Sequence, residues 1–481
     1  MGQAMTLQLD DIQGVILHGY GALDDAAFLL LTIDDVAAAK QWLSQLPLRD
    51  STVRPDVTDT CTNIAFTPSG LARLGLPPEH LGMLAGEFRE GMSGTEHRRR
   101  ILGDHGDSSP SNWRWNGDDI HALLLLYARD AAAVADLENS HDLPGAGLRV
   151  VRRLDSLTLP GRKEHFGFRD GISQPLIDGY DDGGPAGNTV APGEFVLGYP
   201  NAYGQYTDRP LVDPAADPRG LLAAAADAPA LRDLGKDGSY LVFRQLKQDV
   251  AGFWNSLAER SADVLDRVPA CVGLAAKMVG RWPSGAPLVK APTADDPALA
   301  DDNDFMYFRS EDPDGLKCPI GSHLRRSNPR DALDPVPGSD RSIDVGKRHR
   351  IIRRGRAYGA PLAPSMDPAD MIGAGDDGAE RGLHFICFNS QLGRQFEFIQ
   401  HTWVNSAKFD GGYAEDDPIA GARGTGNGNG NGNGDGHGTF TVQQEPIRRR
   451  VTGLPRFVHT VGGAYFFMPG VAATRYLAAL P

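Results

Sequence analysis

Short apolar runs that are typical of β-strands recur along both halves of the chain, and they constrain its fold more than any other feature. Turn-forming residues flank these runs, which occupy residues 28–33, 62–67, 121–128, 148–154, 240–246, 383–390 and 464–470. Helix-like segments lie between the runs, several of them opening on Asp, Ser or Asn caps, at 34–46, 69–76, 130–140, 250–261 and 389–403. Strands and helices mixed in this way predict an α+β protein whose antiparallel sheets carry helices on one face.

The length of the chain indicates more than one folding unit. Because 481 residues exceed what one hydrophobic core usually supports, two domains or a duplicated one are expected. Residues 183–193 and the loop-rich region that continues to about residue 238 suit an insertion or a connection between domains. Residues 424–438 contain no apolar side chain, and this composition predicts a flexible surface loop.

Charge and cysteine usage exclude several classes of partner. The chain has 48 basic and 62 acidic residues, a net charge of −14, which disfavours nucleic acid and anionic membranes as partners. No apolar run approaches the length of a membrane span, and the first residues lack the basic and apolar regions of an export signal, so we expect a cytoplasmic protein. The four cysteines have no CxxC spacing, which predicts reduced thiols rather than a zinc cluster or a disulfide framework.

The stretch HFGFRDGISQPLIDG, residues 165–179, places Asp170 between Arg169 and Gly171. An acid in this position is compatible with a turn residue, a metal ligand or a proton carrier in a pocket. The chain contains no HExxH, GxxxxGK[ST] or GxSxG motif, which excludes the commonest motif-bearing hydrolases and nucleotide enzymes. The local sequence alone leaves the three interpretations of Asp170 open.

The stretch CPIGSHLRRSNPRD, residues 318–331, offers His323 beside Arg325, Arg326 and Arg330. One interpretation is a short basic helical turn with an exposed histidine. The other is a single imidazole presented to a haem iron, with the arginines available for the haem propionates.

The stretch GKRHRIIRRGRAYG, residues 346–359, is strongly basic. A solvated basic strand and a nucleic-acid patch both fit this pattern, and the acidity of the whole chain argues against the second. A strand through RHRIIRRG would point Arg353 inward and Arg354 outward. An inward arginine needs anions, which a haem pocket would supply.

Together with these stretches, a set of segments in fixed order resembles the dye-decolorising (DyP-type) haem peroxidases over nearly the full chain. The segments are DIQGVILHGYG (11–21), FGFRDGISQP (166–175), GEFVLGYPNAYG (193–204), GSYLVFRQLKQDVAGFW (238–254), CPIGSHLRRSNPR (318–330), HRIIRRGRAYG (349–359), HFICFNSQLGRQFEFIQ (384–400) and GGAYFFMPG (462–470). The second segment carries the GxxDG signature of the family at Gly167, Asp170 and Gly171. Long insertions make the chain similar to the larger class of the family.

The resemblance implies a fold and a haem site. It implies two ferredoxin-like α+β domains, which we place at residues 1–230, with the GxxDG motif, and 231–481, with most of the haem contacts. It assigns Asp170 as the distal acid, Arg353 as the distal arginine that also contacts the cofactor, and His323 as the proximal ligand of the haem iron. The glycines, Gly171 in particular, would let the backbone lie close to the porphyrin. The resemblance also implies that the cofactor is haem b, held noncovalently, and the absence of CxxCH gives no indication of a covalent haem.

The resemblance also implies the reaction, which is the oxidation of bulky donors by hydrogen peroxide. The donors would be anthraquinone or azo dyes and phenolic compounds; the alternative is a haem transport, storage or sensing protein with incidental peroxidase activity. Glu397 is our candidate for the acceptor of the second ring proton of the proximal histidine, against a surface acid. Tyr358 and Trp403 are candidates for surface radicals, against ordinary core aromatics. The sequence leaves the oligomeric state open, a homo-oligomer included.

Overall fold

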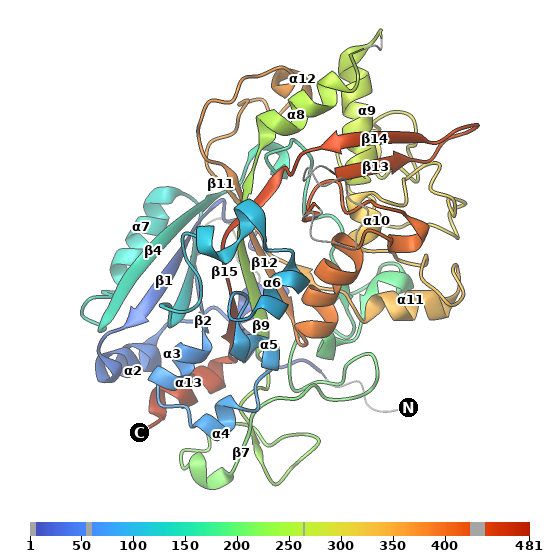
Figure 1. The fold of residues 1–481 in the computed structure, drawn as a ribbon. Coiled ribbons are helices and arrows are strands. Elements are labelled where there is room, and N and C mark those ends of the chain that lie inside the picture. Colours follow the sequence, from blue (N-terminus) through green and yellow to red (C-terminus); the bar gives the residue numbers. More distant parts are fainter. Residues whose placement is uncertain (1–5, 54–59, 263–264, 424–437) are drawn as a thin grey trace.

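The structure is a computed structural model that describes residues 6–53, 60–262, 265–423 and 438–481. The loop predicted at 424–438 lies outside the described residues except for Gly438, which begins a strand. The arrangement of the elements is shown in Figure 1.

Two antiparallel sheets dominate the molecule (Figure 1). Each has strands at four positions, and the two sheets have equivalent strand orders around their central strands. The first sheet runs β4-β1-β3-β2 and the second runs β10/β11-β12-β9-β15, with β10 and β11 sharing one edge of β12. In both sheets the first strand in sequence lies between the third and the fourth, which is the ferredoxin-like arrangement. Their strands are β1 (Asp25–Ile33), β2 (Cys61–Phe66), β3 (Ala122–Ala128), β4 (Leu148–Leu157), β9 (Ser239–Gln248), β10 (Ile352–Arg353), β11 (Arg356–Tyr358), β12 (Gly382–Asn389) and β15 (Val458–Met468).

The two sheets join edge to edge at two narrow seams. At one seam Phe66 of β2 pairs with Phe467 of β15, and at the other Leu157 of β4 pairs with Ala357 of β11. Because β9 also pairs with β12 along its length, the circuit of strands closes on itself. The α+β fold with two ferredoxin-like halves is therefore confirmed.

Helices cover the outside of this circuit, and their starts follow the caps expected from the sequence. Asp35 accepts hydrogen bonds from the backbone N–H groups of Ala37 and Ala38, at 2.9 and 3.1 Å, and Asp130 accepts one from Ala133 at 2.8 Å. The α-helices are α1 (Gly14–Leu17), α2 (Val36–Gln45), α3 (Pro68–Arg73), α4 (Pro78–Leu81), α5 (Gly86–Glu90), α6 (Glu96–Leu102), α7 (Ala131–Ser140), α8 (Val250–Glu259), α9 (Arg267–Val279), α10 (His323–Ser327), α11 (Asp340–Lys347), α12 (Pro368–Met371) and α13 (Val471–Ala479). The helix expected at 389–403 is π-helical, over Gly393–Glu397 and Ile399–Val404.

Short strands lie outside the central circuit. They are β5 (Leu176–Ile177), β6 (Thr189–Val190), β7 (Leu211–Val212), β8 (Arg232–Asp233), β13 (Gly438–Val442) and β14 (Arg449–Leu454). Within 183–238 the described strands are two residues long, as a loop-rich region predicts.

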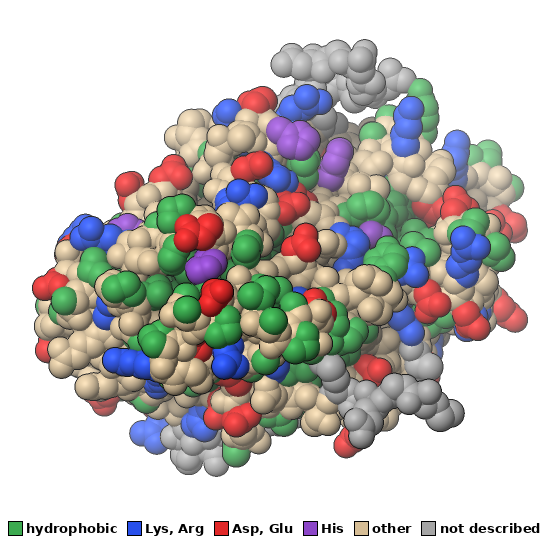
Figure 2. Space-filling model, turned by 90° about the horizontal axis from the view of Figure 1, so that it is seen from below, with side chains coloured by type: hydrophobic (Ala, Val, Ile, Leu, Met, Phe, Trp, Pro, Cys, Tyr) green, Lys and Arg blue, Asp and Glu red, His purple; other side chains and the backbone are tan. Residues whose placement is uncertain are grey.

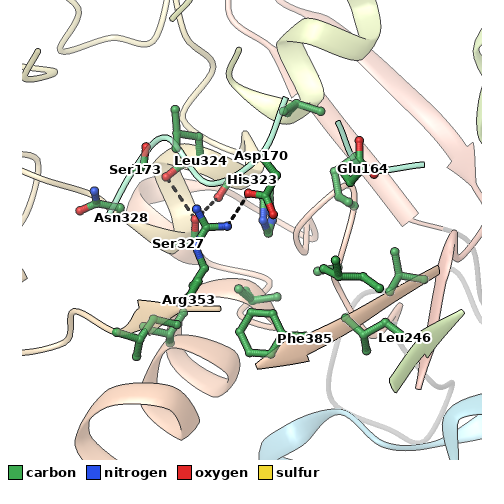
Figure 3. Close-up of a pocket in the computed structure, with 18 of the residues that line it drawn as sticks. Glu164, Asp170, Ser173, Leu246, His323, Leu324, Ser327, Asn328, Arg353 and Phe385 are labelled. Carbon is green, nitrogen blue, oxygen red and sulfur yellow. Dashed lines mark hydrogen bonds and ion pairs between the residues drawn. The ribbon is translucent and has the colours of Figure 1, made fainter. Parts of the chain in front are cut away.

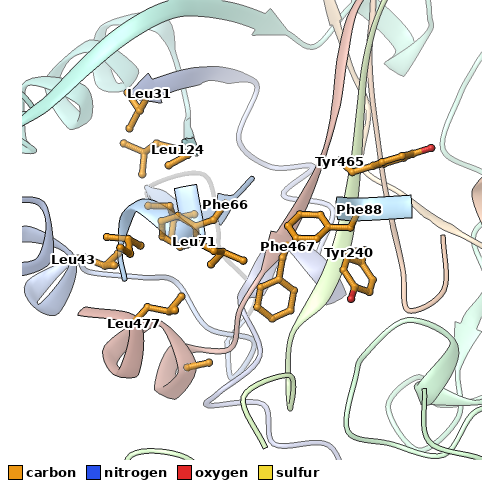
Figure 4. Close-up of a cluster of buried hydrophobic side chains, with 14 of the residues drawn as sticks. Leu31, Leu43, Phe66, Leu71, Phe88, Leu124, Tyr240, Tyr465, Phe467 and Leu477 are labelled. Atoms are coloured by element: carbon orange, nitrogen blue, oxygen red, sulfur yellow. The ribbon is translucent and has the colours of Figure 1, made fainter. Parts of the chain in front are cut away.

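Both faces of β1, β2 and β3 in the first sheet are buried, which explains why these strands are largely apolar, whereas the edge strand β4 is mostly exposed. On β3, Leu123 and Leu125 face the interior of the strand circuit, while Leu124 faces an outer cluster that contains Leu43 of α2 and Leu477 of α13 (Figure 4). Each such leucine contributes about 1.5–3 kcal/mol to stability through burial. The C-terminal helix α13 thus packs on the first half of the molecule, and our division at residue 230/231 remains a prediction.

On the face shown in Figure 2, acidic and basic side chains are interspersed, in keeping with a surface that carries both signs. Among the residues that the structure describes, no helix combines the length and the apolar character needed to span a bilayer.

Candidate active site

A cavity of about 280 Å³ lies between segment 164–173, helix α10 and strands β9, β10 and β12. Leu246 of β9 and Phe385 of β12 form part of an apolar wall (Figure 3). Asp170, His323 and Arg353 line the same cavity from three other segments (Figure 3). The structure thus brings together the three residues that the sequence singled out, although they are spread over 184 positions of the chain.

Asp170 and Arg353 form an ion pair at the cavity, with 2.8 Å between Asp170 Oδ1 and Arg353 Nη1. Arg353 lies on β10, where the backbone of the arginine is held by the side chain of Gln174. Gln174 Oε1 accepts the Arg353 N–H and Gln174 Nε2 donates to the Arg353 carbonyl, both at 3.1 Å. Gln174 therefore ties the segment that carries the acid to the strand that carries the arginine.

The two motif glycines have backbone conformations that other residues adopt only under strain. Gly171 has φ +84° and Gly167 has φ +91°, and a Cβ on Gly167 would lie 2.7 Å from Met371 Cε. The turn at Gly171 directs its own N–H back to Asp170 Oδ1 at 2.6 Å. The GxxDG signature is thus a backbone requirement of the loop that presents the acid.

The Asp170 carboxyl is stabilised as a carboxylate. Burial would raise its pKa, but attraction to Arg353, the Gly171 N–H and the field of His323 together hold that pKa below the ordinary value of 3.8. The acid can therefore act as a proton acceptor in a mildly acidic medium.

His323 begins helix α10, and its ring is held from behind by Asp417. The distance from His323 Nδ1 to Asp417 Oδ2 is 2.8 Å, and the other carboxylate oxygen of Asp417 accepts the N–H groups of Ile419 and Ala420 at 2.8 and 2.9 Å. Burial would lower the pKa of His323, but Asp417 outweighs it and raises that pKa. Burial would raise the pKa of Asp417, and His323 with the backbone donors lowers it. The ionised Asp417 fixes the proton on Nδ1 and leaves Nε2 as the free ligand atom.

Glu397, our candidate for this acceptor, does not contact His323, and the assignment is corrected to Asp417. Glu397 instead accepts a hydrogen bond from Arg98 Nη1 at 2.5 Å and another from the Tyr465 hydroxyl at 2.8 Å. It is buried among these partners on the π-helical segment. Asp417 lies 94 residues from His323 in a loop, and no motif or spacing marks it in the sequence.

Tyr358 and Trp403 are interior side chains, so their assignment as surface radicals is corrected. Their exposed fractions are 7 and 5 %. Tyr358 stacks on His384 with ring centroids 4.6 Å apart, and Trp403 packs edge-on against His349 at 5.2 Å. Both therefore belong to the packed interior, as most aromatics do.

The arginines near His323 do not line the cavity, contrary to their interpretation as propionate partners. Arg325 donates to the carbonyls of Asp312 and Pro313, and Arg326 donates to those of Trp403, Ser406 and Glu415. Arg330 donates to the carbonyl of Phe305 at 2.6 Å. These guanidinium groups hold the loops around α10 in place.

Other cationic and polar groups of the cavity wall lack anions. Arg350 and Arg456 line the cavity and form no ion pair among the residues described here. Burial lowers the pKa of Arg350 to about 9 and that of Arg456 to about 10. Within the described part of the chain, Arg350 Nη2 and Asn328 Nδ2 are buried donors with no hydrogen-bond partner. These groups fit the acidic edge of a ligand whose body is apolar, which is the character of haem.

A second carboxyl group, Glu164, was missed by sequence reasoning. It accepts hydrogen bonds from the N–H groups of Phe166 and Phe168, at 2.9 and 3.1 Å, and from Gln248 Nε2 at 2.7 Å. No cation pairs with it among the described residues, and burial raises its pKa to about 7. The cavity wall therefore holds two acids in opposite states, an ionised Asp170 and a Glu164 that is protonated in acid.

No family model matches the chain. The chain is similar to a dye-decolorizing peroxidase of Mycena epipterygia, with 32% identity over 98% of this chain and 87% of that protein. A solved dye-decolorizing peroxidase in complex with 2,6-dimethoxyphenol superposes with a TM-score of 0.76 at 27% identity, covering 98% of this chain and all of the other. A second solved dye-decolorizing peroxidase, from work on asymmetric sulfoxidation by engineering its heme pocket, superposes with a TM-score of 0.77 at 28% identity. It likewise covers 98% of this chain and all of the other. The chain belongs to the dye-decolorizing peroxidases, a family of haem enzymes.

Proposed function

We propose that the protein is a haem-dependent peroxidase that uses hydrogen peroxide to oxidise bulky organic donors such as anthraquinone or azo dyes and phenolic compounds. The observation that carries this proposal is the convergence of His323 and of the Asp170–Arg353 pair on one cavity. A solved relative holds a substituted phenol, which supports phenols as donors.

The cavity would hold haem b noncovalently. His323 would ligate the iron through Nε2, with Asp417 fixing its ring, and the unpaired Arg350 and Asn328 donors would bind the acidic groups of the haem edge. Leu246 and Phe385 would contact the ring. When bound, the haem supplies the redox chemistry of its iron.

The residues around the pair handle protons and charge. Asp170 is a carboxylate and can accept a proton from hydrogen peroxide, then return it to the departing oxygen as water forms. Arg353 holds Asp170 in place and stabilises negative charge that develops on the peroxide oxygens. Two electrons from the donors and two protons complete the conversion of hydrogen peroxide to two water molecules.

Two finer assignments also remain proposals. As buried residues, Tyr358 and Trp403 would act only as interior relays for electrons, not as the surface contact of a dye. A cytoplasmic location is supported by Cys61, Cys271, Cys318 and Cys387, which are buried and form no disulfide among the described residues.

The decisive experiment is the absorption spectrum of the purified protein before and after one equivalent of peroxide, followed by steady-state turnover of an anthraquinone dye. We expect a Soret band that shifts with peroxide and a dye that is bleached. Absence of any haem signal after loading would contradict the proposal. A normal Soret band without turnover would favour haem transport or sensing instead.

A further inference from the structure

A second cavity, of about 560 Å³, adjoins the first one. The two share seven lining residues, among them Asp170, Arg169 and Arg353. The remaining wall of the second cavity comes from both halves of the chain, with Leu17, Tyr20 and Leu157 from the first and Arg354 and Arg356 from the second. A small molecule in it would therefore lie against the acid–arginine pair, and its volume lies in the range of small-molecule sites.

The wall of the second cavity is richer in cations than in acids. It contains six cationic residues, namely Arg162, Lys163, Arg169, Arg353, Arg354 and Arg356, and four acids, namely Glu164, Asp170, Asp181 and Asp301. The chain as a whole has the opposite balance, with a net charge of −14. A cationic cavity in an acidic protein concentrates small anions at that place.

Four of the six cations are engaged inside the protein. Arg353 pairs with Asp170 and Arg169 pairs with Asp301. Arg354 donates to the backbone carbonyls of Val15 and Ile16, both at 3.0 Å. Arg356 donates to the carbonyls of Leu23 and Tyr20, at 2.6 and 2.7 Å. These four have little capacity left for a ligand.

Arg162 and Lys163 are the two cations of the wall that stay available. Arg162 Nη2 has one distant contact, 3.4 Å from the Gly21 carbonyl, and Lys163 Nζ donates to the Met366 carbonyl at 3.0 Å. Neither forms an ion pair with an acid in the described ranges of the chain. Their charges can therefore be neutralised by an anionic ligand.

The backbone fixes Arg162 relative to the acid. Arg162 has φ +54°, a conformation that is strained for this residue, and its carbonyl accepts the Asp170 N–H at 3.1 Å. Strained residues of this kind persist where the surroundings hold them, and they concentrate at ligand sites. The backbone of Arg162 is therefore fixed one hydrogen bond away from the backbone of the reacting acid, and the exposed guanidinium extends from that position.

We propose that the second cavity binds small phenols that carry a carboxylate, with the carboxylate on Arg162 and Lys163 and the phenolic end towards Asp170 and Arg353. The oxidation of these donors rests on the proposed peroxidase function. Each donor gives up one electron and its phenolic proton and becomes a phenoxyl radical. Two donors thereby supply the two electrons and two protons that convert one hydrogen peroxide to two water molecules.

Calorimetric titration of the haem-loaded protein without peroxide tests the binding step. The ligands are 4-hydroxycinnamate and its methyl ester, which share the phenolic ring and differ in the negative charge and one methyl group. We expect the wild type to bind the acid about tenfold more tightly than the ester, the size expected for hydrogen bonds to a charged group. Raising the salt concentration should reduce this preference.

Variants separate the charge of Arg162 from its backbone role. Arg162→Gln should abolish the preference for the acid, while Arg162→Lys, which keeps the charge at the same strained position, should retain most of it. Lys163→Gln should reduce the preference at a residue of ordinary conformation, so the test does not depend on residue 162 alone. Arg219→Gln, at an exposed loop position outside both cavity walls, should leave the preference unchanged.

Equal affinity of the wild type for acid and ester would overturn the proposal, as would equal effects of Arg162→Gln and Arg219→Gln. Because no peroxide is present, this outcome is independent of catalysis. Dye turnover without any preference for the acid would remove only this inference. A preference for the acid without any turnover would remove the peroxidase proposal and leave the binding site standing.

Discussion

Two acid–base pairs with the same separation lie at the cavity, and their acids differ in access to a ligand. Asp170 lies 2.8 Å from Arg353, and Asp417 lies 2.8 Å from His323. The side chain of Asp170 is 37% exposed towards the cavities, whereas that of Asp417 is 0% exposed and its second oxygen is occupied by backbone donors. The first pair can exchange a proton with a ligand, and the second can only orient a ring. Access, more than the type of residue, therefore separates the two roles.

The largest expected effect comes from removing proton exchange at the accessible pair. In the haem-loaded protein, Asp170→Asn should lower kcat/KM for peroxide about 10³-fold, because an amide cannot take up the proton. Stopped-flow mixing with peroxide measures this change, and the Soret band should be retained. Asp136→Asn, at an exposed position of α7, is the matched control. A loss of less than tenfold in Asp170→Asn would show that Asp170 is not the base.

The buried pair should give a smaller effect of a different kind. Asp417→Asn should weaken haem retention or turnover by about 10–100-fold, because the ring of His323 loses its orienting charge. The vibrational band of the iron–histidine bond in the ferrous protein should shift to lower frequency.

Glu397→Gln provides the control for the buried pair. It should leave that vibrational band in place and lower the free energy of unfolding by about 2 kcal/mol, because the buried Arg98 loses a partner. A shift of the band in Glu397→Gln but not in Asp417→Asn would reverse our assignment.

Gln174, which links the segment of Asp170 to the strand of Arg353, should have a smaller effect on peroxide kinetics than either pair. Gln174→Ala removes two hydrogen bonds to the backbone of Arg353 and should lower kcat/KM for peroxide about tenfold, with the charge of both partners unchanged. Gln205→Ala, at an exposed loop position, should have no effect on peroxide kinetics. Equal rates in the two variants would show that Arg353 is held without Gln174.

The smallest effect concerns pH. Because the pKa of Asp170 lies below 3.8, its carboxylate form is lost only as the pH falls through that region. We expect kcat/KM for peroxide to change less than about twofold on the Asp170 limb between pH 6 and pH 5, and to decline below about pH 4. In Arg353→Leu the declining limb should move to higher pH, since the guanidinium that offsets most of the effect of burial on the pKa of Asp170 would be gone. A limb that stays in place would mean that another group titrates there.

Much of the fold was predictable because seven apolar runs correspond to long strands of the two sheets. β10 and β11 form no apolar run, since they have two and three residues and each includes an arginine; only β10 was anticipated, by the strand expected through RHRIIRRG. Arg353, Arg356 and the intervening Arg354 are satisfied by backbone carbonyls and by Asp170, partners that a composition argument does not reveal.

The sequence predicted the site residues that lie in recognisable motifs. It did not predict the residues that reach the site only through tertiary contacts. Asp170, His323 and Arg353 lie in recognisable segments, and the structure places them at one cavity. Asp417 lies in a loop and acquires its role only by folding beneath His323. Glu397 was favoured because its segment is recognisable, yet the π-helical backbone turns it towards Arg98. Sequence proximity to a motif is therefore a poor guide to the partners of its residues.

The seam where Leu157 pairs with Ala357 has a consequence for how the reactive pair is assembled. The chain leaves β4 at Leu157 and reaches Asp170 thirteen residues later, while Arg353 lies four residues before Ala357 on the other side of the seam. The acid therefore follows the last strand of the first sheet, and the arginine lies on a strand of the second sheet. The acid–arginine pair exists only where these two sheets meet, so its geometry depends on how the seam holds them together.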